Sequence, residues 1–285
     1  MTVTDEGTST AVAGELRPRR RGLWLVIAGL TAIVLIAPVL WAGAVFLMRH
    51  TQEHTAVYVR PISVLRVDAP AGQVRITAAG PGQTRVAKLV RWEFGRPPAV
   101  RQVWHGRTLT ISSAPCAGGP LKGYCNVTLA IRVPPTVAVQ VTSVDGQVSI
   151  RGLSGQIRAH VASGSVRLAD DRGYVQVQVG SGSASAVALG SGQVDAAVAS
   201  GSLRLAFARP PRLVTARIGT GTATVIVPAG SRYRVAATAG PDVSSHVSQA
   251  LVSPSSPRLI RLSAVTGTIR LAAACCQAPR PGGRT

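Results

Sequence analysis

Aromatic and charged side chains are both scarce in this sequence. Aromatic residues make up 4% and charged residues 15% of its 285 residues, whereas hydrophobic residues reach 46%. A packed helical globule is therefore not expected, and the abundance of Gly, Ala, Val, Ser and Thr suits thin stacked strands. The composition predicts an all-β fold for most of the chain, which is long enough to bury a core without a cofactor.

Acidic residues are also scarce. The chain has 11 Asp and Glu residues against 31 Lys and Arg residues, a formal net charge of +20, and only Lys88 and Lys122 are lysines. Such a surface favours anionic partners, although an arginine-rich composition alone accounts for the same count. Nucleic acid is not the expected partner, because the arginines are spread along the chain without an aromatic stacking platform between them.

One long stretch has no charged residue. Residues 23–48 read LWLVIAGLTAIVLIAPVLWAGAVFLM, long enough to cross a bilayer as a helix. Four arginines in residues 17–21 precede it and predict a cytoplasmic N-terminus. The expected organisation is a disordered basic tail (1–22), a transmembrane helix in the lipid bilayer (23–48), a linker (49–61) and an extracytoplasmic remainder, as in a single-pass protein of the cell membrane. The alternative is a cleaved signal peptide, because Ala42-Gly43-Ala44 resembles a cleavage site.

A short motif occurs twice and reveals a repeat. VASGSVRL at residues 161–168 returns as VASGSLRL at residues 198–205. Glycines at the centre of such motifs recur every 18 to 20 residues, and apolar residues alternate with polar ones on both sides of each glycine. Strict alternation is typical of strands with one buried and one solvent-exposed face. The repeat glycines are Gly146, Gly164, Gly182, Gly201 and Gly221, with further copies around Gly72 and Gly267.

A period of this length predicts stacked units, because no unit can bury its apolar side alone. We therefore expect residues 62–273 to form a β-solenoid (a β-helix or β-roll) with a column of aliphatic side chains inside, followed by a disordered tail (274–285). Arg167 and Arg204 would then lie two coils apart, with Ser185 between them. A meander of antiparallel hairpins is the alternative, because alternation alone does not fix the direction of the strands.

No catalytic constellation is recognisable. The G-x-S-x-G motif is absent, and Asp145, Asp170 and Asp195 occupy three different positions relative to their nearest repeat glycines, so they form no ladder of carboxylates. His160 is expected on the outer side of a strand, without a catalytic partner. No Cys-x-x-Cys pair or histidine cluster offers a zinc site. We therefore predict no enzymatic activity, no cofactor and no metal.

Several segments follow one another in a recognisable order. They are LRVDAPAGQVRI, a Cys-x8-Cys spacing, IRVPPTVAVQVTSVDGQVSIRGLSGQI, the serial SGS coils, VPAGSRYRV and AVTGTIRL. Together they resemble the bacterial putative-adhesin domains of β-strand repeats, relatives of the auto-transporter adhesin head, over residues 62–273. The resemblance implies an extracytoplasmic repeat domain, commonly anchored by one helix and sometimes linked to envelope stress, without established enzymatic activity.

These features predict a non-enzymatic binding or structural module of the bacterial cell envelope. Two alternatives stay open: a sensor or regulatory partner of an envelope-stress system, with a membrane signalling partner, and a polysaccharide-cleaving β-helix enzyme. The residues predicted to contact an anionic envelope polymer or lipid headgroups are Arg158, Arg167, Arg204 and Arg217.

The chain has four cysteines. Cys116 and Cys125 flank AGGPLKGY between two strand-like runs, and we predict a disulfide between them, because thiols outside the cytoplasm tend to be oxidised. Two free thiols are the alternative. Cys275 and Cys276 are adjacent and could form a vicinal bridge, pair between chains or stay reduced, and the sequence favours none of these.

Overall fold

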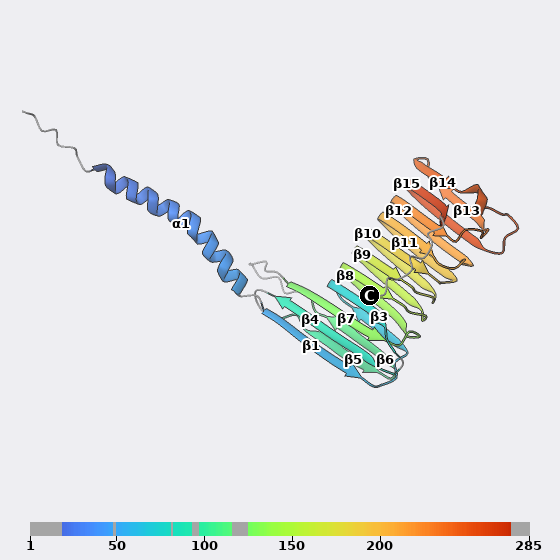
Figure 1. Ribbon diagram of the computed structural model, residues 1–285, viewed down its shortest axis with the longest axis horizontal. Coiled ribbons are helices and arrows are strands. Elements are labelled where there is room, and N and C mark those ends of the chain that lie inside the picture. The colour runs from blue at the N-terminus through green and yellow to red at the C-terminus, as the bar shows by residue number, and fades with distance from the viewer. Residues whose placement is uncertain (1–18, 48–49, 81, 93–96, 116–124, 275–285) are drawn as a thin grey trace, which may run out of the picture. The chain divides into compact units, whose positions relative to one another are not determined.

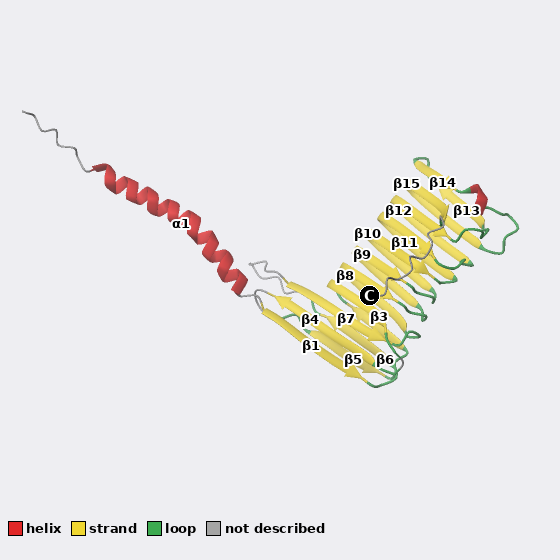
Figure 2. Cartoon of the chain, viewed as in Figure 1, coloured by secondary structure: helices red, strands yellow, loops and turns green. Residues whose placement is uncertain are grey.

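The computed structural model describes residues 19–47, 50–80, 82–92, 97–115 and 125–274. The chain divides into two compact units, Met1–Arg49 and His50–Thr285. Helix α1 (Arg19–Leu47) belongs to the first unit, and all described strands belong to the second (Figures 1 and 2). Most of the predicted N-terminal tail, nearly all of the predicted C-terminal tail, and Cys275 and Cys276 lie outside the described residues.

Helix α1 corrects the predicted localisation. In the part of the chain that the structure describes, no helix is long and apolar enough to cross a bilayer. The prediction of a single-pass membrane protein with a transmembrane helix at residues 23–48 is therefore wrong.

The second unit is all-β, as the composition predicted. Its strands join one sheet whose path begins at β1 and ends at β13, so the sheet is open. A 3-10 helix, η1 (Gln249–Leu251), interrupts the strands near the C-terminus. The strands are β1 (His50–Tyr58), β2 (Val64–Asp68), β3 (Ala71–Ala78), β4 (Thr84–Trp92), β5 (Val100–His105), β6 (Thr108–Ser113), β7 (Cys125–Val133), β8 (Ala138–Arg151), β9 (Ile157–Ala169), β10 (Val175–Leu189), β11 (Gln193–Phe207), β12 (Leu213–Val227), β13 (Arg234–Ala239), β14 (Val243–Val247) and β15 (Leu259–Ala273).

The long strands stack in parallel and in register. β8, β9, β10, β11, β12 and β15 pair in this order, and each repeat glycine lies beside the repeat glycine of the next strand. In Figure 1 these strands lie side by side, from green through yellow to red. Parallel pairing excludes the hairpin meander for this part of the chain. The residues that the repeat aligned are therefore neighbours in space.

Each long strand has two arms that share one core. We call the part before the repeat glycine the first arm and the part after it the second arm. Alternate residues of both arms are buried, for example Ile157 and Leu168 in β9. A cavity of only about 10 Å³ is lined by Val166 and Leu168 from the second arm of β9 together with Val175 and Val177 from the first arm of β10. The apolar sides of the two arms therefore face each other across tightly packed aliphatic side chains.

The stacked glycines explain why the repeat needs Gly at its centre. Gly164 has φ +129° and Gly182 also has φ +129°, a backbone conformation that side chains with a Cβ rarely adopt. A Cβ added to Gly182 would collide with the carbonyl oxygen of Gly164 in the preceding strand, and Gly201 meets Gly182 in the same way. Each strand can therefore approach the backbone of the preceding strand at this position only where its own residue lacks a side chain.

The two ends of the stack depart from the simple repeat. β15 pairs with β12 on one side. On its other side β13 pairs with the first arm of β15 and β14 pairs with the second arm. At the other end β2 lies between β8 and β6, and β3 lies between β8 and β7. Antiparallel strands β5, β4 and β1 complete that end.

One of these strands falls where a linker was expected. β1 (His50–Tyr58) lies within the predicted linker 49–61 and pairs antiparallel with β4. Most of its residues are exposed, so it lacks the apolar alternation by which a strand is recognised. Tyr58 at its end packs against Trp104 with the ring centroids 5.3 Å apart, and both contact the core. The aromatic residues of this region thus help to cover the end of the stack.

Candidate binding surface

One outward-facing position of the second arms carries alternating arginine and hydroxyl side chains. It lies three residues after the repeat glycine, and backbone pairing places its residues side by side on consecutive strands. In the order of the stack the residues are Arg75, Ser149, Arg167, Ser185, Arg204, Thr224 and Arg270. We call the four arginines the arginine row. Each row arginine is separated from the next by one strand that carries a serine or threonine.

The arginine row is exposed and its charge is not neutralised. All four guanidinium side chains belong to exposed residues, whereas the hydroxyl residues between them are half-buried. Within the described part of the chain, the ion pairs involve Arg151 and Arg217, not the row arginines. Arg167 donates a 3.3 Å hydrogen bond to Ser165 Oγ. The row therefore offers four positive charges to solvent on one face of the sheet.

A second row of uncharged polar side chains runs beside the first. It lies one residue after the repeat glycine, and its amide and hydroxyl groups bond between strands. Gln73 donates to Gln147 Oε1 at 2.8 Å, and Gln147 donates to Ser165 Oγ at 3.4 Å. This polar row consists of Gln73, Gln147, Ser165, Ser183, Ser202, Thr222 and Thr268.

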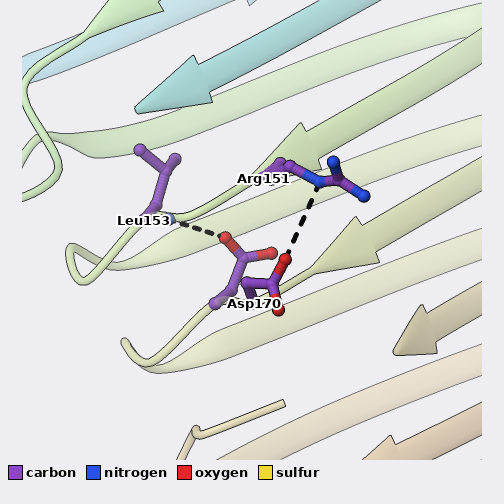
Figure 3. Close-up of polar contacts among 4 residues, drawn as sticks. Arg151, Leu153 and Asp170 are labelled. Atoms are coloured by element: carbon purple, nitrogen blue, oxygen red, sulfur yellow. Dashed lines mark hydrogen bonds and ion pairs between the residues drawn. The ribbon is translucent and has the colours of Figure 1, made fainter. Parts of the chain in front are cut away.

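A hollow of about 730 Å³ lies over the second arms of β3, β8, β9 and β10. Its lining includes Arg75 and Arg167 of the arginine row, together with Arg151 and Asp170. Arg151 Nε lies 3.8 Å from Asp170 Oδ2 (Figure 3). The carboxylate of this hollow is thus paired with an arginine outside the row, which leaves Arg75 and Arg167 available.

The first arms present a different outer face. Arg158 Nε lies 3.4 Å from Gln176 Oε1, and His160 lines a shallow hollow of about 360 Å³ beside them. Arg217 pairs with Asp195 at 2.7 Å. Two of the four predicted contact residues, Arg158 and Arg217, therefore lie on the first arms, and the charge of Arg217 is neutralised by Asp195.

The structure brings the other two predicted arginines together. Arg167 and Arg204 lie two strands apart with Ser185 between them, as the period predicted. Sequence reasoning missed Arg75 and Arg270, which complete the row. The signal was present, because both residues lie three positions after a repeat glycine, Gly72 and Gly267 respectively.

A buried carboxyl group lies at the turn that follows the second arm of β9. Asp171 is fully buried, and its Oδ1 accepts a 2.8 Å hydrogen bond from the backbone N–H of Leu153 (Figure 3). Its Oδ2 has no hydrogen-bond partner among the described residues. Desolvation raises the pKa of Asp171 to about 7, while the Leu153 N–H acts in the opposite direction. Sequence reasoning considered the exposed Asp170 and missed this neighbour.

Potential catalytic and metal-binding groups are dispersed. Asp145 directly precedes the repeat glycine of β8, Asp170 lies in a turn and Asp195 lies on a first arm, so the three carboxylates share no position in the repeat. Over residues 19–47, 50–80, 82–92, 97–115 and 125–274, no three His, Cys, Asp or Glu side chains gather as a metal site would require. The buried Asp171 faces a backbone amide and not an open site.

Cys125 opens β7 and is disulfide-bonded. Cys116 lies outside the described residues. The predicted pairing of Cys116 with Cys125 therefore stays a prediction.

No family model and no curated protein matches the chain. Similar solved structures include a putative cell adhesion protein from Clostridium sporogenes, 11% identical, which covers 79% of this chain and 100% of its own, with a TM-score of 0.35. A putative adhesin from Bacteroides fragilis is 16% identical and covers 78% of this chain and 97% of its own, with a TM-score of 0.40. A putative adhesin from Parabacteroides distasonis is 10% identical, covers 78% and 97%, and has a TM-score of 0.27. Neither membrane anchoring nor a relation to the auto-transporter adhesin head follows from these structures.

Proposed function

We propose that the second unit is a non-enzymatic binding module of the bacterial cell envelope that holds a polymer along the outer face of its stacked strands. The observation that carries this proposal is the in-register stack of second arms, which repeats the same polar positions across seven strands. A surface that repeats with the strand spacing suits a partner that repeats along its own length. An extended polymer is such a partner.

We also propose that the stack is a β-solenoid, in which each strand bends at its glycine and the chain returns through the turn to begin the next coil. Two observations support this description. Residues from both arms line the same small cavity, and positive φ angles occur at the repeat glycines of the long strands other than Gly146. A strand that bends at its glycine would leave the outer faces of its first arm and its second arm free for a ligand.

Non-enzymatic function is favoured by the chemistry of the outer faces. A polysaccharide-cleaving site needs acid and base groups that converge on one bond. Asp170 and Asp195 are paired with arginines instead, and Asp171 is buried against the backbone N–H of Leu153. The two alternatives left open by the sequence, a cleaving enzyme and a regulatory partner of an envelope-stress system, receive no support from the described residues.

The test is a co-sedimentation experiment with the purified full-length protein and insoluble envelope polysaccharide from bacteria. We expect saturable co-sedimentation without the release of new reducing ends into the supernatant. Heat-unfolded protein is the control for nonspecific trapping. Protein that stays in the supernatant would refute the binding role, and reducing ends that accumulate with time would refute the non-enzymatic role.

A further inference from the structure

We propose that the arginine row binds an extended polysaccharide that carries one carboxylate per disaccharide. This inference rests on the proposed binding function and specifies its ligand. It is carried by the alternation in the row, in which Arg75, Arg167, Arg204 and Arg270 occupy every second strand of seven.

The period of the row sets the period of the ligand. Neighbouring strands lie about 4.8 Å apart, so successive row arginines are about 9.6 Å apart along the stack and the whole row covers about 29 Å. In an extended chain of pyranose sugars with alternate uronic acids, the carboxylates recur at a comparable two-sugar interval. Such a chain would place one sugar over each strand, with a uronic acid at each arginine.

The side chains of the row suit both kinds of sugar. A guanidinium binds a carboxylate through two parallel N–H donors, a contact that is stronger and more directional than a hydrogen bond between neutral groups. The positions between the arginines hold Ser149, Ser185 and Thr224, whose short hydroxyl side chains leave room for a neutral sugar and can bond to its hydroxyl groups. The adjacent polar row adds amide and hydroxyl groups along the same direction.

The same features disfavour other polyanions. Double-stranded DNA carries one charge per about 1.7 Å of its axis, far denser than the row. Single-stranded nucleic acid binds chiefly through bases stacked on aromatic side chains, and both rows consist of Arg, Ser, Thr and Gln. A carboxylate on every sugar would place half of the charges opposite hydroxyl groups instead of arginines.

The first experiment measures how affinity depends on ligand length. Hyaluronan oligosaccharides are the probe, since they carry one carboxylate per disaccharide, and binding to the full-length protein is followed by calorimetry. Because four arginines pair with four carboxylates, affinity should rise up to eight sugars and change little beyond that length. Neutral chitin oligosaccharides should bind at least about tenfold more weakly.

The second experiment uses two arginines of the same strand. Arg167 and Arg158 are both exposed residues of β9, but only Arg167 belongs to the row. Arg167→Gln should weaken binding of the octasaccharide about threefold, and Arg167→Gln combined with Arg204→Gln about tenfold. Arg158→Gln removes the same charge from the other face and should leave the affinity within about 1.5-fold of the wild type.

The inference is overturned if Arg158→Gln and Arg167→Gln have equal effects, since the binding would then depend on net charge alone. It is also overturned if the protein does not bind hyaluronan, or if it prefers single-stranded DNA, polygalacturonate or vesicles of anionic phospholipid over hyaluronan of the same charge. In each case co-sedimentation with envelope polysaccharide would show separately whether the proposed binding function stands. Loss of co-sedimentation, or the release of reducing ends, would instead refute the proposed function itself.

Discussion

The backbone N–H of Leu153, in the turn after β8, donates a 2.8 Å hydrogen bond to the carboxyl group of Asp171, in the turn after β9. Leu153, Asp171 and Leu189 each lie seven residues after a repeat glycine. All three are fully buried, and main-chain hydrogen bonds link their turns. A carboxyl group thus lies between two buried leucines of the neighbouring turns. Its burial raises the pKa of Asp171 from 3.8 to about 7.

Asp171 should make the stability of the protein depend on pH. In the unfolded chain this carboxyl ionises near pH 4, whereas in the folded state it keeps its proton until about pH 7. The folded state therefore binds more protons between these values, and the free energy of unfolding contributed by this group falls as pH rises through that window, by no more than about 4 kcal/mol. Above pH 7 the contribution is constant.

Asp171→Asn isolates this effect, because the amide oxygen can still accept the hydrogen bond from Leu153 while the titration is lost. Urea denaturation of both proteins between pH 4 and pH 8 is the measurement. The stability of Asp171→Asn relative to the wild type should increase from pH 4 to pH 7 and then level off. Two curves that stay parallel over the whole range would show that the buried carboxyl does not titrate in this window.

Replacing a repeat glycine of the stack with alanine should destabilise the folded protein. Gly182→Ala forces a Cβ toward the carbonyl oxygen of Gly164 and requires an unfavourable φ of +129°. Backbone atoms cannot give way as a flexible side chain can, so we expect a loss of about 3 kcal/mol or more in the free energy of unfolding. Thermal and urea denaturation measure this loss.

Gly192→Ala is the matched control for Gly182→Ala. An added Cβ at Gly192 has Arg212 Nε as its nearest neighbour, at 3.9 Å, which is an ordinary contact. This variant should be neutral or more stable by up to about 1 kcal/mol, since alanine restricts the unfolded chain. Equal losses in the two variants would mean that the glycine column is not what limits the approach of the strands.

The sequence predicted the stack because its main determinant is local. In β9, alternation alone identifies Val166 and Leu168 as buried and Arg167 as exposed. The glycine period then gives the register, and with it the neighbours of Arg167. Hence half of the predicted contact residues belong to one row, and the same rule applied to the outlying strands β3 and β15 yields Arg75 and Arg270.

The parts that sequence reasoning did not predict depend on distant pairing. Nothing in the local pattern of β15 indicates that it lies between β12 and β13, because any in-register neighbour would satisfy its alternation. β1 is polar on both sides from His50 to Thr55 and is held by its pairing with β4. Asp171 was missed because a carboxyl group breaks the apolar column that its position otherwise contains.

The disulfide of Cys125 should join it to Cys116. Closing a loop of about ten residues would stabilise the folded state by about 2.7 kcal/mol in the chain-entropy model. Mass spectrometry of a proteolytic digest without reduction should contain a peptide pair linking these residues, and Cys125→Ser should lower the free energy of unfolding by a similar amount. A linked peptide that contains Cys275 or Cys276 with Cys125 would contradict the prediction.

A new arginine placed in the row should change which polymer the arginine row prefers. Ser185 lies between Arg167 and Arg204, so Ser185→Arg halves the spacing of positive charges across β9, β10 and β11. Repulsion between neighbouring guanidinium groups should lower the free energy of unfolding by up to about 1 kcal/mol. Affinity for polygalacturonate, which has a carboxylate on every sugar, should rise relative to hyaluronan. Ser181→Arg adds the same charge to β10 at an exposed residue outside the row; a shift of equal size in that variant would mean that net charge, not the spacing of the row, selects the polymer.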